Sequence, residues 1–176
     1  MKKKLDPKVS FIAQSAAIAA IYVVLTLVFA PISFGPIQFR VAEALTILPL
    51  FTPAAIPGLF IGCLLANLLG GAIVLDVIFG SIATLIGAVF GYLLRKNRWL
   101  VPIPAILSNA IIVPLVLMYG YGVPIPLYLQ MIYVAVGEVL GCYVLGELLA
   151  SALKPIYNRL FAGSQQEDTV EDKTKG

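Results

Sequence analysis

The sequence predicts an all-α integral membrane protein, a bundle of six transmembrane helices with both termini in the cytoplasm. Three observations support this prediction. Of 176 residues, 60% are hydrophobic and 12% are charged, about half the charged fraction that is usual in soluble domains. The stretch 9–153 holds only eight of the charged side chains. Apolar segments of helical length also follow one another, with short breaks rich in Gly, Pro or basic residues.

The first three expected helices differ in length. Val9–Ala30 is an apolar run that is long enough to cross a bilayer and too long for the apolar part of a signal peptide. Phe39–Phe51 contains Pro49, and both this segment and Ala54–Leu69 fall short of the roughly 20 residues that an upright crossing needs. We therefore expect these two helices to lie against neighbours or to begin below the membrane surface.

The last three expected helices are longer and clearly separated. Val77–Leu94 follows a Gly-rich break, Leu100–Met118 follows the basic turn RKNR, and Leu127–Leu153 follows the loop YGYGVPIP. Each approaches or exceeds the length of a membrane crossing. The six segments together fill the chain with one membrane domain.

Basic residues give the expected orientation. With the N terminus inside, nine Lys and Arg flank the inner ends of the helices, whereas Arg40 alone lies on the outer side. Residues 1–8 then form a basic cytoplasmic N terminus, residues 9–155 the six-helix domain, and residues 156–176 a polar cytoplasmic tail that we expect to be disordered. Lipid headgroups explain the net charge of +3, so no nucleic-acid partner is expected.

The sequence lacks the residues and motifs that metal binding, ATP binding and hydrolysis usually require. The chain has no histidine, and Cys63 and Cys142 lie in apolar runs without a CxxC spacing, so we expect packing cysteines, no metal and no cofactor. It contains no GxxxxGK[ST], GxSxG or HExxH pattern. We therefore expect that the protein is not an enzyme and draws energy from an ion gradient or a partner.

Charged side chains within the apolar segments are the first candidates for function, because a charge in a membrane is costly. Glu138 lies about 18 Å along the last expected helix, where it either makes an interhelical hydrogen bond or contacts a ligand. Arg40 and Glu43 share a helical face and can neutralise each other. Gln38 beside them adds a donor and an acceptor, which favours ligand capture.

Further polar residues lie on the same, outer side of the expected bundle. Asp76 can cap the fourth helix or contact a ligand, and Asn67 and Asn109 can join helices or bind a ligand. Tyr133 belongs to a group of tyrosines that fits an interfacial belt, although one of these rings can also stack on a planar ligand. With Glu138 these residues predict an apolar pocket with a few polar groups, the usual composition of a small-molecule site.

The first expected helix carries a face of small residues. Ala13, Ala16, Ala17 and Ala20 recur at spacings of three and four, which lets another helix approach closely. The neighbour is either a helix of the same chain or another protein that docks in the membrane.

Two stretches carry a family resemblance. FGPIQFRVAEALTILPLFTPAAIPGLFIGCLLANLLGG (Phe34–Gly71) and DVIFGSIATLIGA (Asp76–Ala88) resemble the QueT family. Members of that family are S components of energy-coupling-factor (ECF) transporters and proposed carriers of queuosine precursors. The six-helix layout extends the resemblance over the chain except its tail. Ala16 and Ala20 match the AxxxA docking motif of such subunits, and Ala13 with Ala17 fits it as well.

The resemblance implies a substrate-binding subunit of an ABC-type importer in a bacterial cell membrane. Its implied ligand is a 7-deazaguanine base such as 7-aminomethyl-7-deazaguanine, which the first extracellular connection, with Gln38, Arg40 and Glu43, would cover. Its implied partner is an energising module of one transmembrane coupling protein and two ATP-binding ATPases. Two alternatives stay open: an S component for another vitamin or small heterocycle, and a stand-alone membrane carrier.

Overall fold

A computed structural model describes residues 6–33, 39–155 and 157, and these residues form helices and connections with no strand among them. In chain order the elements are α1 (Pro7–Val28), α2 (Ala30–Ser33), the 3₁₀-helix η1 (Val41–Leu50), α3 (Ala55–Leu69), α4 (Val74–Leu93), the 3₁₀ turn η2 (Arg98–Leu100), α5 (Ile103–Tyr119), α6 (Leu127–Glu138), the π-helix η3 (Val139–Leu145) and α7 (Gly146–Leu153). Gln38 and almost all of the expected tail lie outside the described residues.

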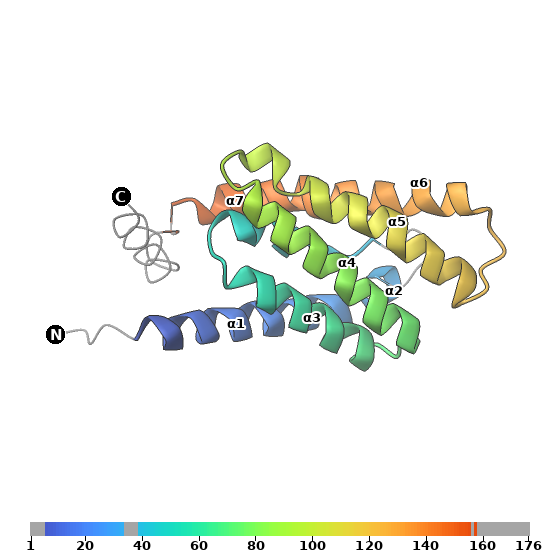
Figure 1. Cartoon of the computed structure of the whole chain (residues 1–176), viewed down its shortest axis with the longest axis horizontal. Helices are drawn as coiled ribbons and strands as arrows, with labels where there is room; N and C mark the ends of the chain where they lie inside the picture. The colour runs from blue at the N-terminus through green and yellow to red at the C-terminus, as the bar shows by residue number, and fades with distance from the viewer. Residues whose placement is uncertain (1–5, 34–38, 156, 158–176) are drawn as a thin grey trace.

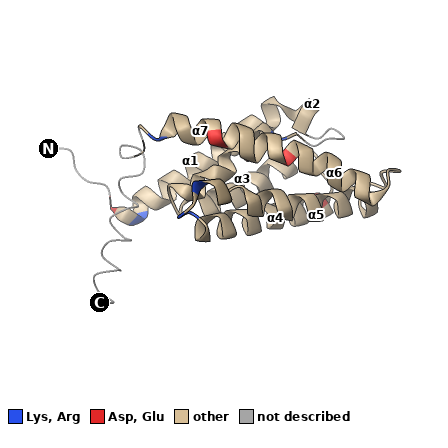
Figure 2. Ribbon diagram, turned by 90° about the horizontal axis from the view of Figure 1, so that it is seen from above, with Lys and Arg blue, Asp and Glu red and all other residues tan. Residues whose placement is uncertain are grey.

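The helices run back and forth along one axis, and α1 begins at the end of the bundle where α7 ends (Figure 1). Four helical segments are long and apolar enough to cross a membrane: α1, α4, Arg98–Tyr119 and Leu127–Leu153. Two shorter apolar helices, η1 and α3, accompany them. Most of the basic residues lie toward the end at which α1 begins (Figure 2). The all-helical membrane architecture agrees with the sequence prediction.

Each expected segment contains a helix, but two details differ from the prediction. Ala30–Ser33 forms a short helix where the sequence indicated only a break. The interpretation of Asp76 as a helix cap is wrong, because α4 begins at Val74 and its N-cap residue is Ile73, without a side-chain cap bond. Asp76 therefore lies inside the first turn of α4, and its buried side chain is directed to other partners.

Small residues determine how closely the helices pack. A Cβ atom on Gly58 of α3 would lie 2.9 Å from the Ser15 carbonyl oxygen of α1, and one on Gly62 would lie 2.8 Å from the Cβ atom of Tyr22. A Cβ atom on Gly87 of α4 would lie 2.6 Å from the Cα atom of Ala105 in α5. Contacts this close are available only to glycine, so the α1–α3 and α4–α5 pairs depend on these positions.

The helix η1 lies within the bundle and contacts α1, α3, α4, η3 and α7. Most of its residues are buried, including the apolar Ile47 and Leu48 and the charged Glu43. A Cβ atom on Gly141 of η3 would lie 3.0 Å from the carbonyl oxygen of Arg40, which precedes η1, and one on Gly146 of α7 would lie 3.4 Å from the Ala44 carbonyl oxygen within η1. The central position of η1 brings its polar residues close to several other helices.

Candidate functional site

Buried polar side chains from five helices and a connecting segment form one cluster inside the bundle. Each of its six main members is less than 5% exposed: Arg40, which precedes η1, Glu43 of η1, Asn67 of α3, Asp76 of α4, Asn109 of α5 and Glu138 of α6. We call this set the polar cluster. Charged groups at membrane depth are costly and usually mark a ligand or ion path or a fixed partner. The cluster is therefore the candidate functional site.

One part of the polar cluster is a pair of carboxyl groups, Glu43 and Glu138, which we call the carboxyl pair. Ligating atoms of these two residues and of Cys142 lie within 4.8 Å of one another. The Cys142 thiol donates to Glu138 Oε2 at 3.0 Å and weakly to Glu43 Oε2 at 3.9 Å. The Tyr22 hydroxyl of α1 donates to Glu43 Oε1, and Asn109 lies within hydrogen-bonding range of Glu138.

An irregular helix lies at or beside each member of the carboxyl pair. Glu43 lies in the first turn of the ten-residue 3₁₀-helix η1, although 3₁₀ segments longer than four residues are uncommon. Glu138 is the last residue of α6, and the π-helix that follows contains Cys142. A π segment inside an α-helix frequently coincides with a functional site. Here Glu138 and Cys142 are brought together immediately beside η1.

The other part of the polar cluster surrounds Asp76, and we call Arg40, Asn67 and Asp76 the Asp76 site. Arg40 forms a buried ion pair with Asp76, with 3.9 Å between Nη2 and Oδ2. The Asn67 amide donates to the Asp76 carbonyl oxygen at 3.4 Å and to Cys63 Sγ at 3.6 Å. The Tyr121 hydroxyl also donates to Asp76 Oδ2 at 3.2 Å.

Tyr121 closes the Asp76 site from the loop that follows α5. Its hydroxyl oxygen accepts the Ile73 amide at 3.2 Å while its proton is donated to Asp76. Partial burial raises the pKa of Tyr121, and the neighbouring Asp76 carboxylate raises it further. The phenol therefore remains a proton donor at neutral pH and holds the start of α4 to the α5–α6 loop.

The charges of the polar cluster do not balance. Three carboxyl groups, Glu43, Asp76 and Glu138, are buried with Arg40, the one buried cation among the described residues. Arg40 forms an ion pair with Asp76 and also interacts electrostatically with Glu43 and Glu138, so three carboxyl groups share one cation. Two ionised carboxylates side by side in a low-dielectric interior repel each other strongly. A positively charged group or a proton between them would remove that repulsion.

The carboxyl pair with Cys142 also has a donor set that a metal ion can use, since carboxylate oxygen and thiolate sulfur both bind zinc. The same atoms, however, already accept or donate hydrogen bonds within the chain, from Tyr22 to Glu43 and from Cys142 to Glu138. These internal hydrogen bonds already use the atoms that would bind a metal ion.

The structure brings most, but not all, of the residues that the sequence singled out into one cluster. Arg40, Glu43, Asn67, Asp76, Asn109 and Glu138 come together in the polar cluster, whereas Gln38 lies outside the described residues. Tyr133 is not brought to the cluster. Its side chain is 39% exposed, because the buried face of α6 consists of Gln130, Val134, Gly137 and Glu138.

Sequence reasoning did not identify four residues of the site. Tyr22, Cys63 and Cys142 are residue types that are common in apolar packing, and they lie in long apolar runs without any pattern that distinguishes them. Tyr121 lies in the YGYGVPIP loop, where a tyrosine also fits an interfacial belt, and only the fold of that loop brings it to Asp76. The sequence signal that does identify this region is the set of ionisable residues within apolar runs.

The alanine face of α1, defined by Ala13, Ala16, Ala17 and Ala20, points away from the chain, and all four side chains are exposed. The side of α1 that packs against α3 is instead formed by Ser15, Ile18, Ala19 and Tyr22. Of the two neighbours expected for this face, a helix of the same chain is therefore excluded within the described residues.

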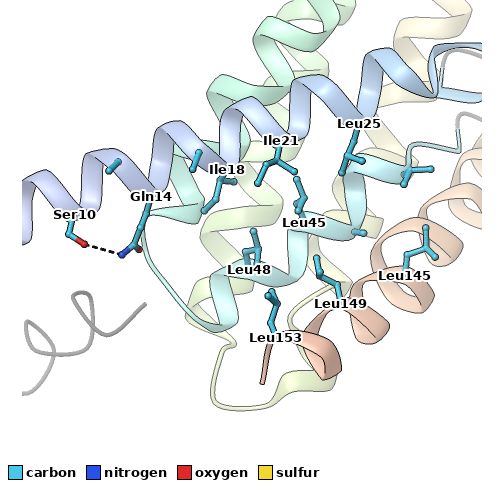
Figure 3. Close-up of a pocket in the computed structure, with 14 residues that line it drawn as sticks. Ser10, Gln14, Ile18, Ile21, Leu25, Leu45, Leu48, Leu145, Leu149 and Leu153 are labelled. Atoms are coloured by element: carbon cyan, nitrogen blue, oxygen red, sulfur yellow. Dashed lines mark hydrogen bonds between the residues drawn. The ribbon is translucent and has the colours of Figure 1, made fainter. Parts of the chain in front are cut away.

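An apolar groove borders each side of the alanine face. The larger groove, about 670 Å³, contains Ala13 and Ala17 and lies between α1, η1, η3 and α7. Figure 3 shows Ile18, Ile21 and Leu25 of α1 opposite Leu45 and Leu48 of η1. The smaller groove, about 340 Å³, contains Ala16 and lies between α1 and α3. Neither groove is lined by a member of the polar cluster.

Comparison with known proteins identifies the family of this chain. A model of the QueT transporter family matches residues 12–155. The chain belongs to the QueT transporter family. A curated relative from Lactococcus lactis subsp. cremoris (strain MG1363), named queuosine precursor transporter QueT, is 43% identical over 81 residues. The matched segment spans 45% of this chain and 47% of that relative. No solved structure matches the chain.

The QueT family is described as a transporter family, and the four membrane-length apolar helices among the described residues fit a multi-pass membrane protein. The family match includes every described member of the polar cluster and the whole alanine face. A transporter needs a place where its substrate binds inside the membrane domain. The polar cluster of this QueT protein has the burial and the hydrogen-bonding groups that are usual in a small-molecule site.

Proposed function

We propose that this protein is the substrate-binding S component of an ECF-type importer and takes up a queuosine precursor, a 7-deazaguanine base such as 7-aminomethyl-7-deazaguanine. The observation that carries the proposal is the polar cluster, buried in the membrane domain of a QueT family member. Its relative is named for queuosine precursor transport, which supports this class of ligand.

The chemistry of the polar cluster suits such a base. A deazaguanine presents N–H donors and a carbonyl acceptor on its edge, for which carboxylate, amide and guanidinium groups are complementary. An aminomethyl substituent adds a positive charge, which the carboxyl pair would stabilise. Arg40, Glu43, Asn67, Asp76, Asn109 and Glu138 are the residues that we assign to binding, together with Gln38 beside them in the sequence.

The alanine face supports an assembly with an energising module. Its four side chains are small and exposed on a helix that is long and apolar enough to cross a membrane, and the two bordering grooves offer space for bulky side chains of a partner helix. Close helix packing in a membrane depends on such small residues. The partner would be a transmembrane coupling protein that is joined to two ATPases and supplies the energy for transport.

Titration calorimetry on the purified chain in detergent tests the proposal. We expect saturable binding of 7-aminomethyl-7-deazaguanine, weaker binding of the neutral 7-cyano base, and no ATP hydrolysis. A base present at 100 times its dissociation constant should also stabilise the protein by about 2.7 kcal/mol. Adenine serves as a control base. Heat with another vitamin and none with any queuosine precursor would refute the ligand assignment and leave the family assignment intact.

A further inference from the structure

We propose that the polar cluster contains two ligand subsites with different tasks. Asp76 and Asn67 accept hydrogen bonds from the donor edge of a planar base, whereas Glu43 and Glu138 hold a cationic substituent on the same ligand. This assignment rests on the proposed function. It specifies which carboxyl group recognises which part of the ligand.

The first argument comes from the two oxygen atoms of Asp76. Oδ2 is occupied, because it pairs with Arg40 and accepts the Tyr121 hydroxyl. Oδ1 is buried and has no hydrogen-bond partner among the described residues. The Asn67 side-chain oxygen is in the same situation, although its amide nitrogen donates to Cys63 and to the Asp76 backbone. Buried acceptors without a donor are rare and unfavourable.

Gly80 supplies the second argument, because it leaves space beside both side chains. A Cβ atom at this position would lie 3.0 Å from Asp76 Oδ1 and 3.2 Å from Asn67 Nδ2. Gly80 lies within α4, where glycine is a poorer helix former than alanine. The helix thus has a glycine at the point where a side chain would crowd the two residues with unpartnered acceptors.

The two acceptors suit a particular chemical edge. The N1–H and 2-amino groups of a guanine-type base point in nearly the same direction and offer adjacent donors. A carboxylate oxygen and an amide oxygen on neighbouring helices can each take one of them. The carboxylate bond is charge-assisted and therefore the stronger of the two. A base without the 2-amino group would leave one acceptor unsatisfied.

The carboxyl pair has a different environment. Its oxygens already accept from the neutral donors Tyr22 and Cys142. Among the described residues, one buried cation, Arg40, serves the pair and Asp76 together. The pair is therefore better supplied with hydrogen-bond donors than with positive charge. An ammonium group placed near Glu43 and Glu138 supplies that charge. Arg40 interacts electrostatically with Asp76 and with Glu43, which makes the two subsites neighbours.

The assignment is tested with three bases and three variants. The parent base is 7-aminomethyl-7-deazaguanine. One analogue lacks the 2-amino group, and the other, 7-methyl-7-deazaguanine, lacks the ammonium. We expect each analogue to bind the unaltered protein about tenfold more weakly or worse, since each leaves a buried group unpaired. The variants are D76N, E138Q and the control E147Q, whose carboxyl group lies outside the polar cluster.

The pattern of losses decides between the subsites. In D76N the penalty for removing the 2-amino group should shrink several-fold, while the penalty for removing the ammonium persists. In E138Q the reverse is expected, and E147Q should retain both penalties. A reversed pattern, or penalties that no variant changes, would overturn the subsite assignment alone. Failure of the unaltered protein to bind the parent base would instead refute the proposed function and the subsites together.

Gly80→Ala provides a test that alters no charge. The added methyl group crowds Asp76 Oδ1, so we expect at least a tenfold loss of parent-base affinity, without a lower melting temperature in the absence of ligand. Gly58→Ala is the matched control. Its Cβ atom would meet Ile18 and the Ser15 carbonyl oxygen, so it should lower the melting temperature and leave the ratio of affinities for the three bases unchanged. Unaltered binding by Gly80→Ala would overturn the assignment of Asp76 and Asn67.

Discussion

The polar cluster and the alanine face are two regions of this QueT protein with opposite physical character. In the polar cluster, charged and amide side chains are almost fully buried and are held by hydrogen bonds and an ion pair. On the alanine face, small apolar side chains are exposed and border apolar grooves. Ligand recognition relies on fixed polar groups, whereas docking in a membrane relies on close packing. Substitutions in the two regions should therefore have separable effects.

The two regions meet at α1. Its outward side carries the alanine face, and Tyr22 on its inward side donates a hydrogen bond to Glu43. A change in the position of α1 that follows docking would therefore reach the carboxyl pair through one side chain. Binding and docking are independent only if substitutions can alter each of them alone.

The largest effect is expected for Arg40→Leu, which removes the buried cation of the polar cluster. Asp76 would then be left buried without its ionic partner, and loss of one member of a buried pair typically costs about 3–5 kcal/mol. Unfolding in mixed micelles measures the loss. The double variant Arg40→Leu, Asp76→Leu should recover a large part of it, because Asp76 is then no longer a buried charge without its partner. Wild-type stability of the single variant would contradict the assigned ion pair.

The sequence predicted the helices because long apolar runs leave few other folds for the backbone. It also predicted Glu43, Asp76 and Glu138 as site residues, since an ionisable group in such a run needs a partner. Tyr22 and Cys142 escaped the prediction because both residue types are compatible with ordinary apolar packing. Their roles arise only when η1 and η3 place them beside the carboxyl pair.

The irregular pitch of η1 and η3 was also beyond the sequence prediction. Apolar periodicity identifies a helix but does not distinguish a π segment from the α-helix around it, and Val139–Leu145 is as apolar as its neighbours. The same limit applies to Tyr133. Its position in a helix was predictable, whereas the side of α6 that turns inward depends on the packing of Gln130, Val134 and Glu138.

Glu138→Gln should have the next largest effect, and it acts on binding. The substitution keeps the shape of the side chain but removes its charge and replaces one acceptor with a donor. We expect a loss of about 1–3 kcal/mol in binding free energy, or roughly tenfold to more than a hundredfold in the dissociation constant. Glu43→Gln should behave similarly if both carboxyl groups hold the cation.

The control for these variants is the melting temperature without ligand. A Glu138→Gln protein that binds normally but melts well below the unaltered protein would show a packing role and remove Glu138 from the site. Normal docking to the energising module by the same variant would confirm that the two regions are separable.

Ala16→Leu and Ala20→Leu test the other region. Added methylene groups at a close helix contact cost about 1–3 kcal/mol, so co-purification with the energising module should fall roughly tenfold or more and uptake should be lost. Affinity for the base should stay unchanged, because both side chains are exposed. Val24→Leu, at an exposed position further along α1, is the matched control. Normal assembly of both variants would place the docking surface elsewhere.

The smallest effect is expected for Glu147→Gln, which provides a reference for a charge outside both regions. Arg98 of η2 pairs with the Glu147 carboxylate and also donates to its backbone oxygen at 2.9 Å and to Ser151 at 2.7 Å. The Arg98 side chain is 30% exposed and the Glu147 side chain 12% exposed, compared with 5% and 1% for Arg40 and Asp76. Partly exposed ion pairs typically contribute less than about 1 kcal/mol. Two of its hydrogen bonds also survive the substitution. Unfolding in mixed micelles should therefore shift by under about 1 kcal/mol, with base affinity and docking unchanged. A loss of stability as large as that of Arg40→Leu would mean that the difference in burial does not distinguish the two ion pairs.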